Sequence, residues 1–71
     1  MWVSKVNELI GSSPDGFEEA ARCVLARANQ TLRGITGTKV LEEKARVEDG
    51  VIVEYLVTMQ VIFLLEEAVG T

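Results

Sequence analysis

The strongest constraint on the fold of this chain is an apolar run near its C-terminal end, from Val51 to Leu65. In an extended strand, side chains at alternate positions share one face of the sheet, and period-2 spacing of this length predicts a strand. One face would carry Val51, Val53, Tyr55, Val57, Met59, Val61, Phe63 and Leu65, and the other Ile52, Leu56, Ile62 and Leu64. A small chain cannot cover two largely apolar faces, so we expect other copies of the chain to cover one of them.

The length and the residue types restrict how the fold is stabilised. Seventy-one residues predict a single domain, residues 1–71, and a core of this size rarely supplies more than roughly 3–5 kcal/mol of net stability. Cys23 is the only cysteine, which excludes a disulfide within the chain and favours a reducing compartment. The chain has no histidine, so a zinc site of cysteine and histidine and histidine-based catalysis are excluded. We therefore expect no enzymatic activity.

Charge and hydropathy exclude two classes of partner. The formal net charge is −4, from 11 acidic and 7 basic residues, and binding to a phosphate backbone needs clustered lysine and arginine. The first residues, Met1 to Lys5, lack the apolar core of a signal peptide, and no apolar stretch of about 18 residues is present. These patterns predict a cytoplasmic protein that binds neither nucleic acid nor membranes.

The first half of the chain predicts a strand followed by a helix. Val3 to Ile10 is a short mixed run that ends at Gly-Ser-Ser-Pro, residues 11–14. Ser13 is a suitable N-cap and Pro14 a suitable first helical residue. Gly34 is a suitable helix terminator. Helical spacing places one apolar stripe on this segment, formed by Phe17, Ala20, Ala21, Val24, Ala28, Leu32 and Ile35.

The second half predicts two strands joined by a tight turn. Thr38 to Val47 alternates as a half-exposed strand, and Asp49-Gly50 is a strong hairpin signal. The order is β-α-β-β, an α+β fold with a three-stranded antiparallel sheet and one helix on one face. We expect the helix to cover the face of Val51, Val53, Tyr55, Val57, Met59, Val61 and Phe63. The face of Ile52, Leu56, Ile62 and Leu64 would then meet another subunit or a closed interior.

Several segments together resemble the dodecins. They are residues 11–21 (Gly-Ser-Ser-Pro-Asp-Gly-Phe-Glu-Glu-Ala-Ala), 26–33 (Ala-Arg-Ala-Asn-Gln-Thr-Leu-Arg) and 53–63 (Val-Glu-Tyr-Leu-Val-Thr-Met-Gln-Val-Ile-Phe), with the Asp-Gly turn between the last two. The resemblance runs from about Val3 to Glu66. It implies a β-α-β-β protomer whose sheet partly wraps around the helix, and a hollow homododecamer. It also implies binding and storage of flavins (riboflavin, FMN or FAD) without enzymatic activity.

The resemblance assigns three binding positions, and at two of them the residue present deletes the binding chemistry rather than modifying it. Flavin-binding dodecins stack the isoalloxazine ring on a tryptophan at the start of the second strand, and that position corresponds to Gly37. A glutamine that hydrogen-bonds the polar edge of the ring corresponds to Leu56, and a polar or charged residue corresponds to Lys44. Ring stacking contributes about 1–3 kcal/mol, and unpaired polar atoms cost about 1–3 kcal/mol. The sequence therefore predicts flavin binding that is weakened by about 2–6 kcal/mol or lost.

Two motifs have more than one interpretation. Trp2 is either an aromatic residue of an edge strand or interface, or a stacking residue that has moved away from its usual position. Gly34-Ile35-Thr36-Gly37 matches the GXXG loop of KH modules. That loop joins two helices on a basic surface, whereas this segment joins a helix to a strand in an acidic chain. We therefore do not assign it to nucleic-acid binding.

Acidic residues in the second half have two interpretations. They are either a solvated face or, together with symmetry-related copies, ligands for a divalent cation, because Ca²⁺ and Mg²⁺ prefer several carboxylate oxygens. The residues are Glu42, Glu43, Glu48, Asp49, Glu54, Glu66 and Glu67. Cys23 lies opposite the apolar stripe on the predicted helix, so we expect an exposed small residue without a base to activate it.

Overall fold

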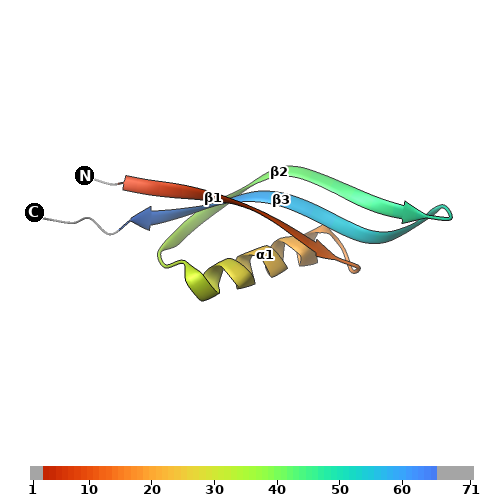
Figure 1. Cartoon of the computed structure of the whole chain (residues 1–71), viewed down its shortest axis with the longest axis horizontal. Coiled ribbons are helices and arrows are strands. Elements are labelled where there is room, and N and C mark those ends of the chain that lie inside the picture. The colour runs from red at the N-terminus through yellow and green to blue at the C-terminus, as the bar shows by residue number, and fades with distance from the viewer. Residues whose placement is uncertain (1–2, 66–71) are drawn as a thin grey trace, which may run out of the picture.

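The computed structural model describes residues 3–65, which form one three-stranded sheet with one helix packed on it (Figure 1). The elements are β1 (Val3–Ser13), α1 (Phe17–Thr31), β2 (Ile35–Glu48) and β3 (Val51–Leu65). This confirms the predicted β-α-β-β order and α+β class. Within residues 3–65, no helix is long and apolar enough to span a membrane. The interpretations of Trp2, Glu66 and Glu67 concern positions outside the described residues.

The apolar strand β3 lies in the middle of the sheet. The strand order is β1-β3-β2, and both neighbours run antiparallel to β3. The turn between β2 and β3 has φ angles of 52° at Asp49 and 77° at Gly50, as expected for the tight hairpin that Asp-Gly predicts. From Tyr55 to Phe63 this apolar strand thus has both of its hydrogen-bonding edges paired.

Strand β1 extends three residues beyond its predicted end. It pairs with β3 as far as Ser13, which lies opposite Tyr55. Gly11 was interpreted as part of a turn, but it lies within the strand, where the helix approaches its backbone. A Cβ atom at Gly11 would lie 2.3 Å from Cγ2 of Val24 and 3.0 Å from the carbonyl oxygen of Ala20. The glycine is therefore a site of close packing between helix and strand.

The predicted helix start at Ser13 and Pro14 is wrong. The helix begins at Phe17, with Gly16 as its N-cap at a φ of 152°. Ser13 is buried at the end of β1, and its Oγ accepts a hydrogen bond from the backbone N–H of Asp15 at 3.0 Å. The serine hydroxyl stabilises the bend between strand and helix, a role that serine plays in turns as readily as at helix caps.

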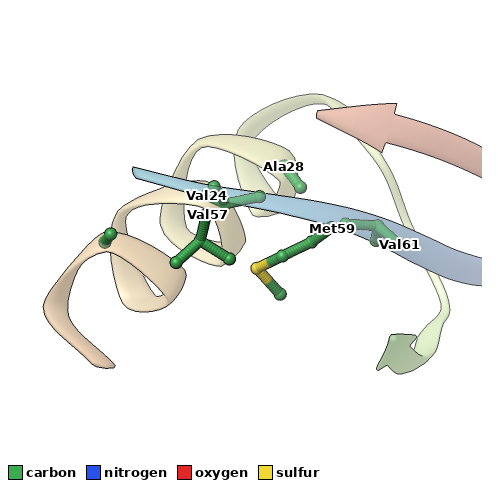
Figure 2. Packing of buried hydrophobic residues seen from close by; sticks show 6 residues of the cluster. Val24, Ala28, Val57, Met59 and Val61 are labelled. Carbon is green, nitrogen blue, oxygen red and sulfur yellow. The ribbon is translucent and has the colours of Figure 1, made fainter. Parts of the chain in front are cut away.

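The predicted apolar stripe is confirmed within the helix, but the predicted helix end at Gly34 is wrong: α1 ends at Thr31 with Leu32 as its C-cap, and Ile35 is the first residue of β2. Ala20, Val24 and Ala28 are buried against β3, as Figure 2 shows for the labelled residues of the cluster. The β3 side of the core is Val57, Met59 and Val61. The partly buried residues around this cluster are Leu9, Phe17, Ala21, Leu32 and Ile35. The core is small, in keeping with a chain of this length.

The helix covers only part of β3. Fifteen helical residues span about 22 Å, whereas the fifteen residues of β3 span about 50 Å. The start of the helix reaches Tyr55, whose ring meets that of Phe17 edge to face at 5.0 Å. Val51 lies beyond this point and is 59% exposed. The prediction that the helix covers Val51 is therefore wrong, because a helix is much shorter than a strand of equal residue count.

The sheet continues past the helix as a two-stranded arm. Pairing of β1 with β3 ends at Tyr55, and beyond it only β2 and β3 remain paired (Figure 1). We call residues 46–54 the arm. Val47, Val51 and Ile52 are exposed on it.

Substitution of Gly11 by alanine tests the close contact between helix and strand. We expect Gly11→Ala to lower the free energy of unfolding by about 1–3 kcal/mol, because the new methyl group overlaps Val24 and forces helix and sheet apart. Chemical denaturation followed by circular dichroism measures the change. Gly37→Ala is the matched control, because the nearest atom to its Cβ, in Ile62, is 3.9 Å away. An equal loss in both variants would contradict the packing argument.

Candidate functional site

The sheet face opposite the helix carries all three positions that the resemblance assigns to flavin binding. On β3 this open face is formed by Glu54, Leu56, Thr58, Gln60, Ile62 and Leu64, which alternate with the buried residues under the helix. No described part of the chain covers this face, in agreement with the sequence analysis. It is less apolar than expected, however, because Glu54, Thr58 and Gln60 separate the apolar side chains along the strand.

Gly37 lies near the start of β2, where it pairs with Ile62. Thr36 is an extra residue in the pairing at this point, and its Oγ1 donates a hydrogen bond to the carbonyl oxygen of Ile62 at 3.4 Å. A Cβ atom at Gly37 would meet only the side chain of Ile62, at 3.9 Å. The sheet surface at Gly37 is therefore open and has room for a larger side chain.

Lys44 and Leu56 are direct partners on neighbouring strands. Side chains of directly opposite residues lie on the same face, about 4.5–5.5 Å apart at Cβ. Leu56 is half-buried, whereas Lys44 is exposed, and its Nζ lies 3.9 Å from Oε1 of Glu42. Ser12 of β1 flanks Leu56 on the other side. This end of the open face presents one aliphatic side chain among polar and charged groups.

One protomer does not bring the three positions together. Gly37 lies opposite Ile62, and Lys44 lies opposite Leu56. Six residues of β3 separate these two rows, a distance of about 20 Å along the strand. One flat ring system cannot contact both ends. A site that uses all three positions needs Gly37 from one copy of the chain and Lys44 with Leu56 from another.

An ion-pair network that the sequence analysis missed lies at the base of the arm. Nε of Arg46 is 3.1 Å from Oε1 of Glu54, and its Nη1 contacts the carboxylate of Glu48. The Arg46 guanidinium lowers the pKa of the Glu54 carboxyl, and a hydrogen bond from the Ser12 hydroxyl lowers this pKa further. The network links all three strands. The only sequence signal was the position of Arg46 and Glu54 on either side of the turn.

The sign of this pKa shift sets its pH dependence. A carboxyl whose pKa is lower in the folded chain stabilises the fold above its ordinary pKa, which is 4.5 for Glu54. This contribution is lost as the pH falls through the lowered value. Because Arg46 and Glu48 are exposed and Glu54 is only half-buried, the contribution is small and is screened by salt.

The acidic residues that the structure describes do not form a metal site within one chain. Across residues 3–65, no three acidic or cysteine side chains gather closely enough to hold a metal ion. Glu54 is already paired with Arg46. The carboxylates of Glu42, Glu43, Glu48 and Asp49 belong to exposed residues on β2 and its turn. A cation site built from them needs ligands from other copies of the chain.

A hollow of about 340 Å³ lies on the helix side of the sheet. It arises because α1 packs over β1 and β3 and leaves the helix-side face of β2 uncovered. We call it the groove, and its lining residues are Glu18, Ala21, Arg22, Leu25, Thr38 and Met59. The lining is mostly apolar, and the exposed ion pair of Glu18 and Arg22 lies at its edge. Cys23 is exposed on the helix, as predicted.

Comparison with known proteins identifies relatives along almost the whole chain. The family model of the dodecins matches residues 3–66. The dodecin of Thermus thermophilus is 40% identical over 65 residues, which cover 92% of this chain and 94% of the relative. The calcium dodecin of Mycobacterium tuberculosis is 31% identical over 68 residues, or 96% of each chain.

Solved structures show the same fold. The dodecin of Streptomyces coelicolor superposes with a TM-score of 0.88 and 36% identity, over 94% of this chain and 96% of that one. The calcium dodecin of M. tuberculosis, described as having a novel calcium-binding site, superposes with a TM-score of 0.78 and 28% identity. That match covers 97% of this chain and 99% of the other. The similarity therefore extends over the helix and all three strands.

Proposed function

Because the chain belongs to the dodecin family, as the sequence resemblance predicted, we propose that it is a small-molecule-binding and storage protein and not an enzyme. In this proposal twelve copies form a closed hollow shell. The observation that carries the proposal is the open sheet face. Its family binding positions lie about 20 Å apart within one chain, so a complete site needs more than one copy.

Binding of flavin at this site is weakened in our proposal. Gly37 offers no aromatic surface for stacking, and Leu56 offers neither a donor nor an acceptor to the polar edge of the ring. Lys44 keeps a charged group beside Leu56. The two losses remove the stacking contact and the oriented hydrogen bonds, which together distinguish a flavin from other flat molecules.

Light scattering on a sizing column tests the shell. We expect a particle of about 94 kDa, twelve times the 7.8 kDa of the chain, because the apolar residues of the open face and arm have no cover within the described chain. The measurement is made at micromolar and lower concentrations to detect dissociation. A stable monomer or dimer at micromolar concentration would exclude both the shell and the composite binding site.

A divalent cation is the second candidate ligand. The relative from M. tuberculosis is named a calcium dodecin, and this chain exposes carboxylates on β2 and on the turn that symmetry-related copies would multiply. Oxygen ligands from several chains suit Ca²⁺, which takes 6–8 of them. The proposed assembly would carry a formal charge of about −48, twelve times −4, so cations also reduce its self-repulsion.

Thermal melting separates a specific cation site from general screening. We expect the melting temperature to rise with added NaCl, because salt screens the repulsion between carboxylates. Millimolar CaCl₂ at matched ionic strength raises it further if copies share a calcium site, because a ligand that binds only the folded state stabilises it. MgCl₂ serves as the control for valence. Equal melting temperatures in CaCl₂ and NaCl would exclude calcium as the ligand.

A further inference from the structure

We propose that Arg46 holds the arm in one direction across a hinge at the base of the arm. The hinge is a β-bulge in β3. Arg46 of β2 pairs with Glu54. The next residue, Val47, pairs with Ile52, so Val53 is an extra residue in β3. A bulge bends its strand and increases the local twist. The direction of the arm relative to the rest of the sheet is therefore set at Val53.

The sheet is only two strands wide at this bulge. Pairing of β1 with β3 ends at Tyr55, beyond which only β2 and β3 continue (Figure 1). The other two irregularities between β2 and β3 lie at Thr36 and Leu41, where β1 pairs with β3 on its other side. A third strand fixes the backbone there, whereas two strands alone are at best marginally stable in water. Bending of the described sheet is therefore easiest at Val53.

The bulge also decides which face of the arm Ile52 occupies. Arg46 and Glu48 are two positions apart on β2 and contact each other on one face, so Val47 between them points to the other face. Ile52 lies opposite Val47 and shares that face. The expectation that Ile52 lies with Leu56 on the open face is therefore wrong, because the extra residue shifts the alternation along β3. The direction of the arm thus determines where this exposed aliphatic pair is presented.

The ion pairs of Arg46 span the bulge. Nε of Arg46 lies 3.1 Å from Oε1 of Glu54 on the sheet side, and Nη1 contacts the carboxylate of Glu48 on the arm side. The Ser12 hydroxyl donates a hydrogen bond to Glu54, which joins β1 to the network. We call these ion pairs of Arg46 the latch. Because the donors of a guanidinium have a fixed planar geometry, arginine holds two carboxylates in defined positions.

The neighbouring cation does not span the bulge. Lys44 lies diagonally across from Glu54, but its Nζ is 3.9 Å from Oε1 of Glu42, in the same strand. Its ion pair therefore leaves the direction of the arm free. Helix α1 packs on the other face of the sheet, and Ser12 is the β1 residue of this row. Among the described groups around Glu54, Arg46 is thus the cation that connects the sheet to the arm.

The latch need only be weak to control the arm. Exposed ion pairs contribute little to global stability, and salt screens them. A hinge whose directions are close in free energy responds to much smaller interactions than unfolding does, because a small difference shifts the populations several-fold. We therefore expect loss of the latch to redistribute the arm without unfolding the core.

A fixed arm has a consequence for the assembly, and this consequence rests on the proposed shell. Copies with different arm directions present Val47 and Ile52 differently and cannot all make the same contact, whereas a closed symmetric assembly repeats one contact. The row of Lys44 and Leu56 is the next row on the open face after Arg46 and Glu54. Arg46 is therefore a positioning residue for this half of the proposed binding site.

Distances between two spin labels measure the direction of the arm. In a Cys23→Ser background, the labels are attached at Ile10→Cys on β1 and Val51→Cys on the arm, both exposed positions. Labelled chains are diluted with unlabelled chains before assembly, so that distances within one chain dominate. We expect one narrow distribution when the latch is intact. Arg46→Glu and Glu54→Arg each place like charges across the bulge and should raise the population of other distances about two- to fivefold, the scale of an exposed ion pair.

Charge exchange and a matched control keep the test decisive. Arg46→Glu combined with Glu54→Arg restores opposite charges and should narrow the distribution again, a rescue that a packing role would not give. Lys39→Glu makes the same change in charge opposite Gln60, where the sheet has three strands, and should leave the distribution narrow. If all variants are equally narrow, or if the combined variant is as broad as the single ones, the latch does not hold the arm. A wild-type chain that stays monomeric with a narrow distribution would exclude the shell and support the latch.

Discussion

Restoring two side chains, Gly37→Trp with Leu56→Gln, is expected to raise the affinity for riboflavin by roughly one and a half to four orders of magnitude. The tryptophan supplies the stacking surface, which contributes about 1–3 kcal/mol to the binding free energy. The glutamine hydrogen-bonds the polar edge of the ring, which contributes about 1–3 kcal/mol more to the binding free energy. Every 1.4 kcal/mol is about a factor of ten in the dissociation constant. The open surface at Gly37 has room for the new ring.

Quenching of riboflavin fluorescence measures this gain for the wild-type chain, the single variants and the double variant. Gly37→Ala and Leu56→Met are the controls, because they fill similar positions without adding a ring or an amide. We expect the wild-type chain and both controls to bind weakly. Wild-type binding at nanomolar to low micromolar concentration would show that Gly37 and Leu56 are not the binding positions. A double variant that assembles but gains no affinity would show that the rest of the pocket differs as well.

The second large effect is expected in the core: Val61→Asp should prevent folding. Val61 is fully buried between helix and sheet, where no described side chain can pair with a carboxylate. An uncompensated buried charge costs about 3–5 kcal/mol or more, which equals the stability expected of so small a core. Circular dichroism and the yield of assembled particle measure the loss.

Gln60→Asp is the matched control for this substitution. Gln60 is the next residue in the same strand, but it lies on the open face between Glu8 and Lys39. We expect it to fold, with a change in unfolding free energy within about 1 kcal/mol. Similar damage from both substitutions would mean that the alternation of faces along β3 does not control stability.

The parts of the fold that follow from local patterns were predicted from the sequence. The alternation between Val51 and Leu65 predicted β3 to the residue, and Asp49-Gly50 predicted the turn. The apolar stripe of the helix identified Ala20, Val24 and Ala28, the three buried helix residues. Each of these signals depends on residues within a few positions of one another.

The errors concern features that depend on distant contacts. Gly11 and Ser13 have the composition of a turn, but their roles are set by Val24 above the strand and by pairing with β3. The arm extends past the helix because a helix is shorter than a strand with the same number of residues. Glu54, Thr58 and Gln60 are polar residues of the open face, but apolar residues outnumber them in the run. The face was therefore predicted to be more apolar than it is.

The candidate site was predicted only as a set of positions. The resemblance assigned Gly37, Lys44 and Leu56, and the pairing of strands shows that two of them are neighbours and the third is remote. The seven positions between Gly37 and Lys44 already span about 20 Å in an extended strand, but the pairing of Lys44 with Leu56 cannot be seen without the register. Whether these positions bind a ligand is the question that the riboflavin titrations answer.

The central position of β3 also determines the order in which the sheet can form. Val3, at the start of β1, pairs with Leu65, at the end of β3, so β1 has no partner within this sheet until β3 has left the ribosome. The hairpin of β2 and β3 is local and can close early, whereas the pairing of β1 must close almost the whole chain. Until then β1 and the apolar stripe of α1 remain exposed, and assembly with other copies must wait for β3.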